Sequence, residues 1–239
     1  MANDRINQKQ SFLHGAAVLA AATIIVKIIG AIYKIPLKYI IGEAGFGYFN
    51  TAYEIYSVLL MISTTGLPVA MSRMISEAQT LGNHDQIRKI FRVSVRVFLL
   101  LGVLGTLGMA LFSRQLSVLY TTFDTSWAAI AALSPAVLFI CVIAAFRGFF
   151  QGQSNMTPTS VSQVFEALCK LIIGLAVAWV VMKLTYTPAG GDMTLGAGGA
   201  ILGVTTGCVV SMFYLFRCFR KASKNMPTGG EVKSGKETL

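Results

Sequence analysis

The chain has 239 residues, of which 54% are hydrophobic and only 13% are charged, and its formal net charge is +10. Soluble domains carry about 25% charged residues, so this composition excludes an ordinary soluble domain, an intrinsically disordered chain and a free DNA-binding domain. Four cysteines without a C-x-x-C pair and only two histidines supply neither a disulfide scaffold nor a zinc or haem site. We therefore expect an all-α polytopic membrane protein without a metal site or a cofactor.

Long apolar runs predict six membrane-spanning helices, since about 20 apolar residues cross a bilayer. In chain order they cover residues 11–35, 46–72, 90–112, 127–150, 158–182 and 194–216. The first run follows Arg5 and Lys9 but is too long for a signal-peptide core, which predicts a retained signal-anchor helix. The chain then divides into an N-terminal segment 1–10, a six-helix membrane unit 11–219, and a polar tail or inter-lobe linker 220–239.

The distribution of basic residues predicts the orientation. With the N-terminus inside, thirteen Lys and Arg residues fall on the inner side, four on the outer side and three within the spans, which accounts for all 20. One of the thirteen is Arg147, near the end of the fourth span, which this count assigns to the inner side. Because inner loops are enriched in Lys and Arg, both termini are expected in the cytoplasm, with the protein in the plasma membrane. The basic excess then serves orientation and anionic lipid headgroups rather than nucleic acid.

Ionisable side chains inside the spans mark candidate cavity residues, because a charge near mid-bilayer costs roughly 2.5 to 3.5 kcal/mol on insertion scales. Lys27 lies deep in the first span, and Lys34 and Lys38 follow on the same face. This stripe predicts sites for a phosphate or pyrophosphate group in transit. Alternatively, Lys34 and Lys38 only extend their ammonium groups to the outer interface.

The second span contains Glu54, flanked by Tyr53 and Tyr56, with no partner on its own helix. Its carboxylate either faces water or meets Lys27 across the first two spans, and a protonated form within the membrane is a further alternative. Tyr53 and Glu54 are therefore both candidate cavity residues.

The fifth span carries Glu166 and Lys170 four residues apart, with the acid first, which is the orientation that best supports a same-helix ion pair. Ser162 and Gln163 lie one turn earlier and extend a polar strip. The strip predicts either a pair that lowers the cost of insertion or the wall of a wet cavity.

At the start of the third span, Arg88, Arg92 and Arg96 repeat every fourth residue. Such a row anchors a helix to lipid headgroups, or it recruits an anionic lipid substrate from the cytoplasmic leaflet.

Glycine and proline mark bends and close contacts. Gly66 and Pro68 in the second span and Pro135 in the fourth predict kinks with a hinge role. A glycine stripe in the sixth span predicts close approach of another helix backbone, either within the bundle or in a second subunit or lobe. The stripe consists of Gly199, Gly203 and Gly207.

Two groups of motifs carry a family resemblance. The first comprises residues 30–37 (GAIYKIPL), 42–48 (GEAGFGY), 52–56 (AYEIY) and 66–70 (GLPVA). The second comprises residues 147–152 (RGFFQG), 156–159 (MTPT) and 162–166 (SQVFE). In this order and at these helix ends, they resemble the polysaccharide exporters and lipid-linked oligosaccharide flippases of the MOP superfamily, close to the group of stage V sporulation protein B and the Gram-positive lipid II flippases.

The resemblance implies a MATE-like fold of two six-helix lobes around a central cavity with alternating access, of which this chain resembles the N-terminal lobe. It implies a flippase lobe for polyprenyl-pyrophosphate-linked saccharides such as peptidoglycan or polysaccharide precursors, with Lys27 on the pyrophosphate. Lipid II flippases of the family use cavity cations on the first two helices, whereas residues 46–72 contain no Lys or Arg. Glu54 stands where the family more often has an uncharged residue.

Two other functions remain open at this stage. A MATE-type drug or cation antiporter lobe would couple to sodium or protons through Glu54 or Glu166. A non-transporting product of a truncated or split gene would join a separately encoded second lobe through the face of Gly199, Gly203 and Gly207. A membrane enzyme is not expected, because the ten acidic residues lie mostly in loops and supply no convergent catalytic constellation.

Overall fold

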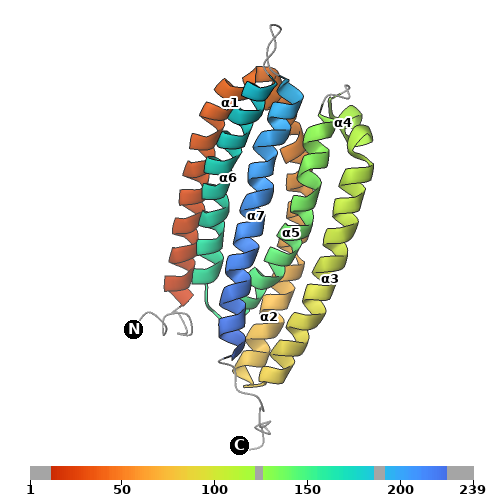
Figure 1. Cartoon of the computed structure of the whole chain (residues 1–239). Helices are drawn as coiled ribbons and strands as arrows, with labels where there is room; N and C mark the ends of the chain where they lie inside the picture. Colours follow the sequence, from red (N-terminus) through yellow and green to blue (C-terminus); the bar gives the residue numbers. More distant parts are fainter. Residues whose placement is uncertain (1–11, 122–125, 186–191, 225–239) are drawn as a thin grey trace, which may run out of the picture.

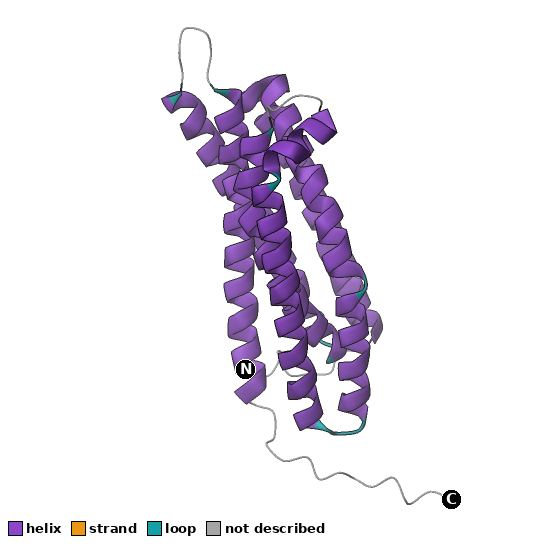
Figure 2. Cartoon of the chain, turned by 90° about the vertical axis from the view of Figure 1, so that its right-hand side faces the viewer, coloured by secondary structure: helices purple, strands orange, loops and turns teal. Residues whose placement is uncertain are grey.

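The computed structural model describes residues 12–121, 126–185 and 192–224, so the predicted segment 1–10 and residues 225–239 of the predicted tail lie outside it. The described chain is helical from end to end and forms one elongated bundle (Figure 1, Figure 2). The helices are α1 (Phe12–Thr65), α2 (Leu67–Thr80), α3 (His84–Leu111), α4 (Ser113–Thr121), α5 (Trp127–Gly152), α6 (Thr157–Leu184) and α7 (Met193–Lys224). The predicted all-α fold is confirmed.

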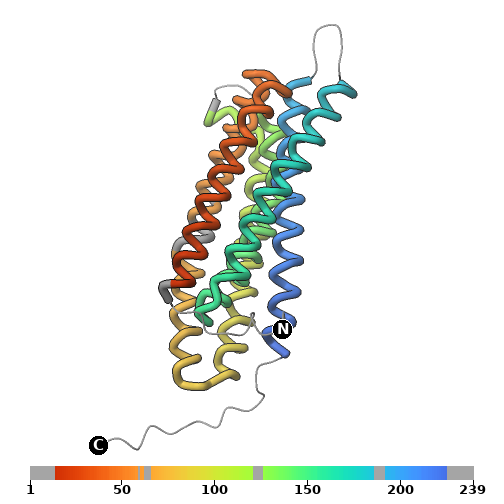
Figure 3. The backbone as a smooth tube through the Cα atoms, turned by 90° about the vertical axis from the view of Figure 1, so that its left-hand side faces the viewer, coloured from red at the N-terminus to blue at the C-terminus, as the bar shows by residue number. Residues whose placement is uncertain are grey.

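Helix α1 contains the first predicted span and most of the second. At Gly42 the backbone has φ 74° and ψ 176°, a conformation that is essentially restricted to glycine. The chain turns there and runs back along the bundle, so that α1 has a first arm, residues 12–41, and a second arm, residues 43–65 (Figure 3). Five described helices are long and apolar enough to cross a membrane, and α1, counted once among them, passes along the bundle twice.

The second predicted span is interrupted where a bend is expected. Gly66 separates α1 from α2, and Pro68 lies in the first turn of α2, where its missing N–H costs no helical hydrogen bond. The predicted end at residue 72 is too early, since α2 continues to Thr80.

Two other boundaries differ clearly from the prediction, and one further helix was not predicted. Helix α3 begins at His84 rather than residue 90, because the Asn83 side chain accepts a hydrogen bond from the Gln86 amide at 3.0 Å and caps the helix. The short helix α4 was not predicted; it lies at the same end of the bundle as the bend of α1 (Figure 1). Helix α7 extends to Lys224, so the start of the predicted tail is helical.

Helix α5 forms the centre of the bundle and is buried along most of its length by α1, α2, α3 and α7. At one end its Phe146 and Phe149 pack with Phe91 of α3 and Phe219 of α7, with ring centroids 4.3 to 5.6 Å apart.

The glycine stripe of α7 packs against α6 within the same bundle. A Cβ atom on Gly203 would overlap the backbone of Gly174, and one on Gly207 would lie 2.8 Å from the carbonyl oxygen of Glu166. The two backbones approach this closely because glycine has no side chain. Because α6 covers the stripe, this face is not available to a second lobe.

At the bend predicted around Pro135, polar side chains satisfy the backbone inside the lobe. Proline lacks the N–H that would reach the Ala131 carbonyl, and the Ser134 hydroxyl donates to that carbonyl instead, at 2.8 Å. The Thr106 hydroxyl of α3 donates to the Ser134 carbonyl at 3.0 Å. The backbone groups at the bend are thus satisfied, and a hinge role for Pro135, Gly66 and Pro68 stays a prediction.

Candidate functional site: a polar cavity beside the first arm of α1

A cavity of about 450 Å³ opens between the first arm of α1, α5 and α6, and its volume lies in the usual range for ligand sites. Five of the residues predicted for a cavity line it: Lys27, Tyr53, Gln163, Glu166 and Lys170. They come from segments more than 100 residues apart in the chain, and the fold alone brings them together.

Arg147 also lines the cavity, although the count of basic residues assigned it to the inner side of the membrane. It lies within α5, which continues to Gly152, and its guanidinium Nη2 is 3.0 Å from the Glu166 carboxylate. The two side chains are only 15% and 24% exposed. Its Nε also donates to the Ser162 hydroxyl at 3.2 Å, so α5 and α6 are joined by two polar contacts.

The predicted ion pair between Glu166 and Lys170 is replaced by the Arg147 pair, because the guanidinium reaches the carboxylate from the facing helix. The Lys170 ammonium lies instead against aromatic rings, with Nζ 4.0 Å from the ring centroid of Tyr53, 5.1 Å from that of Tyr33 and 5.7 Å from that of Phe49. Cation–π attraction therefore holds its positive charge at the cavity wall.

The predicted lysine stripe divides into separate parts. Lys27 lines the cavity, as expected from its depth in the first span. Lys34 is exposed and is not part of the cavity lining. Lys38 forms a surface ion pair, with Nζ 2.8 Å from the Glu43 carboxylate beside the bend at Gly42.

Glu54 lies outside the cavity that its neighbour Tyr53 lines, and it is exposed. Successive residues on a helix point about 100° apart, which explains why only one of the two faces the cavity. Among the described residues Glu54 forms no ion pair with Lys27.

The arginine row of α3 lies away from the cavity. Arg92 and Arg96 are exposed, whereas Arg88 is half-buried. Their headgroup role stays a prediction.

The charges of the cavity wall do not cancel. Lys27, Arg147 and Lys170 supply three positive charges and Glu166 supplies one negative charge, which leaves two positive charges. Within the described ranges no group of three or more His, Cys, Asp or Glu side chains could hold a metal ion. The arrangement is therefore suited to attracting an anion.

Sequence reasoning missed Arg147, although a signal was present. Gly148 and Gly152 follow it, four residues apart, and both contact α2, which shows that α5 is still packed against α2 beyond this arginine. A cation within such a packed stretch needs a partner, and Glu166 is that partner.

The chain is similar to known membrane proteins in both sequence and fold. A protein-family profile described as "Polysaccharide biosynthesis protein" matches residues 12–234. Stage V sporulation protein B of Bacillus subtilis (strain 168) is 29% identical over 236 residues, and lipid II flippase MurJ of the same organism is 29% identical over 214 residues. These matches cover 97% and 84% of this chain but 44% and 39% of the relatives, so the chain spans less than half of their length.

Solved structures share the fold. An outward-facing multidrug resistance MATE family transporter of the MOP superfamily superposes with a TM-score of 0.67 at 16% identity, covering 88% of this chain and 47% of that one. A MOP superfamily transporter from Pyrococcus furiosus Vc1 superposes with a TM-score of 0.64 at 13% identity, covering 96% and 51%. At these identities the likeness shows the fold alone, which is that of about half of a MATE-like transporter.

Proposed function

The chain belongs to the polysaccharide biosynthesis protein family, and on that premise we propose that it forms one lobe of a flippase for polyprenyl-pyrophosphate-linked saccharides, such as peptidoglycan or polysaccharide precursors. The similarity to lipid II flippase MurJ supports transport rather than an enzymatic reaction. Alternating access needs two halves around one site, so the lobe works with a second lobe, in the same polypeptide or separately encoded.

The observation that carries the proposal is the net positive charge of the cavity. A pyrophosphate group is the most highly charged part of the substrate class, and Lys27 and Lys170 present ammonium groups to it while Arg147 is paired with Glu166. Ammonium groups act as point charges, which suits a site that must release the anion again.

The orientation follows from the ends of the bundle. The end where α2 meets α3 and α7 finishes is rich in basic residues, and the opposite end has few (Figure 1). The rich end includes Arg88, Lys89, Arg217, Arg220, Lys221 and Lys224, and the opposite end includes Lys38, Arg114 and Lys183. By the positive-inside rule the rich end, where α1 begins and α7 finishes, faces the cytoplasm of a plasma-membrane protein.

A MATE-type antiporter for cationic drugs is less well supported. The likeness to MATE structures concerns the fold, and a cavity wall with two net positive charges repels a cation. Glu166, one of the two carboxylates considered for ion coupling, is occupied by Arg147, and the other, Glu54, lies outside the cavity.

Binding of geranyl pyrophosphate to the full chain in detergent tests the proposal. We expect Lys27→Gln to weaken binding by about tenfold or more, because a charge-assisted contact is worth about 1.5 to 3 kcal/mol. Lys38→Gln is the matched control on the same helix, outside the cavity, and should change the affinity less than about twofold. Wild-type affinity in Lys27→Gln, or no binding by the wild type, would contradict the proposal.

A further inference from the structure

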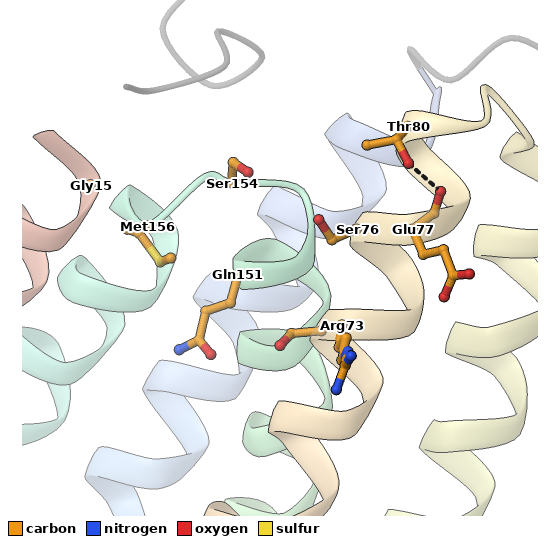
Figure 4. A pocket seen from close by; sticks show the side chains of 9 residues that line it. Gly15, Arg73, Ser76, Glu77, Thr80, Gln151, Ser154 and Met156 are labelled. Carbon is orange, nitrogen blue, oxygen red and sulfur yellow. Dashed lines mark hydrogen bonds between the residues drawn. The ribbon is translucent and has the colours of Figure 1, made fainter. Parts of the chain in front are cut away.

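A second polar pocket, of about 560 Å³, lies at the end of the bundle where α1 begins and α5 meets α6 (Figure 4). We call it the entrance pocket. Its polar wall includes Ser72, Arg73, Ser76, Glu77 and Thr80 of α2 and Gln151 at the end of α5. None of these residues was singled out as a candidate site residue from the sequence.

The entrance pocket lies further along α5 and α1 than the cavity, toward the end of the bundle. Arg147 lines the cavity and Gln151 lines the entrance pocket, one helical turn further along α5, a rise of about 6 Å. On α1, Thr23 lines the cavity and Gly15 the entrance pocket, about 12 Å apart along the axis. An extended ligand with one chemical group in the cavity can therefore place the adjoining group in the entrance pocket.

The wall of the entrance pocket is rigid because α2 lies directly on α5. A Cβ atom on Gly152 would lie 2.7 Å from the carbonyl oxygen of Ser72 and 2.7 Å from Cβ of Ile75. One on Gly148 would lie 3.1 Å from the carbonyl oxygen of Pro68. The two glycines thus place the polar face of α2 beside Gln151. Because this wall is already ordered, binding costs little conformational entropy.

The chemistry of the entrance pocket differs from that of the cavity. Arg73 supplies one positive charge and Glu77 one negative charge, so the wall has no net charge; Glu77 extends from the side of α2 nearer α3, at the rim (Figure 4). The hydroxyls of Ser72 and Thr80 donate to carbonyl groups of their own helix, at 2.9 and 2.7 Å, and so present lone pairs. The Gln151 carboxamide offers both donors and an acceptor.

This set of groups fits a neutral ligand rich in hydroxyl groups better than it fits a phosphate. We propose that the entrance pocket binds the first sugar of the substrate headgroup, with Gln151, Arg73 and Ser76 as hydrogen-bonding partners, while the cavity holds the pyrophosphate. The proposal rests on the proposed function and adds a saccharide subsite to it. The division of charge between the two pockets matches the division of charge along a pyrophosphate-linked sugar.

Two probes separate this subsite from the cavity: geranyl pyrophosphate, and the same compound carrying N-acetylglucosamine on its terminal phosphate. We expect the full wild-type chain to bind the sugar-bearing probe about tenfold more tightly, as two or three added hydrogen bonds provide. Gln151→Ala should remove most of this advantage and change the affinity for geranyl pyrophosphate less than about twofold. Arg73→Gln, which keeps a polar side chain at the surface of α2, should do the same if Gln151→Ala does not fold.

The control is Gln86→Ala, which changes the same residue type at the same end of the bundle but outside the entrance pocket. It should leave both affinities unchanged. Equal affinity of the wild type for the two probes would overturn the saccharide subsite and leave the proposed function standing. If the wild type binds neither probe, both the proposed function and the saccharide subsite are overturned. If Gln151→Ala and Arg73→Gln both still bind the sugar-bearing probe more tightly by the wild-type factor, the sugar binds elsewhere and the subsite is overturned.

Discussion

The guanidinium of Arg147 and the carboxylate of Glu166 meet at 3.0 Å, joining α5 to α6 at the wall of the polar cavity. The contact neutralises one of the three cations of the wall, so that the net charge belongs to Lys27 and Lys170. It also connects to α7, since the side-chain hydroxyl of Ser211 donates at 3.0 Å to the carbonyl of Ser162, whose own hydroxyl accepts from Arg147. The pair thus helps to hold α5, α6 and α7 together at the cavity wall.

Replacement of Glu166 by Ala should destabilise the protein. The Arg147 guanidinium would keep its position in a largely buried setting without its carboxylate, and we expect a loss of about 2 kcal/mol, less than for a fully buried pair. For a chain of this size that corresponds to a fall of roughly 4 to 8 °C in the midpoint of thermal unfolding in detergent. Glu54→Ala, at an exposed glutamate outside the cavity, should leave the midpoint nearly unchanged. Equal midpoints for the two variants would contradict a stabilising role of the pair.

Replacement of Gly203 by Ala tests the contact between α6 and α7. The new methyl group would overlap the Gly174 backbone, which has no side chain to move aside, and we expect a loss of at least about 2 kcal/mol in the free energy of unfolding. The matched control is Gly198→Ala, five positions earlier on α7, where a Cβ atom meets nothing within 4 Å. That change should be neutral or slightly stabilising, because Ala favours a helix over Gly. Thermal unfolding of the two variants side by side checks both expectations.

Replacement of Gly42 by Ala should act through the backbone rather than through packing. The conformation at this bend costs a residue with a Cβ about 1 to 3 kcal/mol, while the nearest atom to a new Cβ is the flexible end of Met193 at 3.6 Å. We expect a lower unfolding midpoint for Gly42→Ala and no decrease for Gly47→Ala, at a helical position with open space. A Gly42→Ala variant as stable as the wild type would show that the bend tolerates a side chain.

Replacement of Lys170 by Gln should weaken binding of geranyl pyrophosphate by about tenfold, if its charge belongs to the anion site as proposed. Lys183 provides the control, because it lies on the same helix and also lies over an aromatic ring, with Nζ 4.8 Å from the centroid of Trp179, but it is outside the cavity. Lys183→Gln should leave the affinity unchanged. Equal effects of the two substitutions would mean that the cavity does not bind the anion.

Hydropathy and periodicity report on single segments of the chain, whereas contacts between helices leave little trace in the sequence. Apolar runs predicted the passes of the chain because burial in lipid acts on every residue of a span, whatever its neighbours. The short α4 was missed because nine residues are too few to give a hydropathy signal. The pair of Arg147 and Glu166 was missed because it links residues 19 positions apart on different helices, and a pattern within one helix favoured Lys170 as the partner instead.

From the sequence alone follow a helical membrane protein, the approximate spans, the break at Gly66 and a set of cavity candidates, because hydropathy and backbone preferences are properties of local segments. These candidates are Lys27, Lys34, Tyr53, Glu54, Gln163, Glu166 and Lys170. Only the tertiary structure decided which of these side chains share one cavity, that Arg147 takes Glu166 and leaves Lys170 to the aromatic rings, and that the glycine stripe of α7 is covered by α6. Those outcomes depend on which helix faces which, and that is determined by packing between segments far apart in the chain.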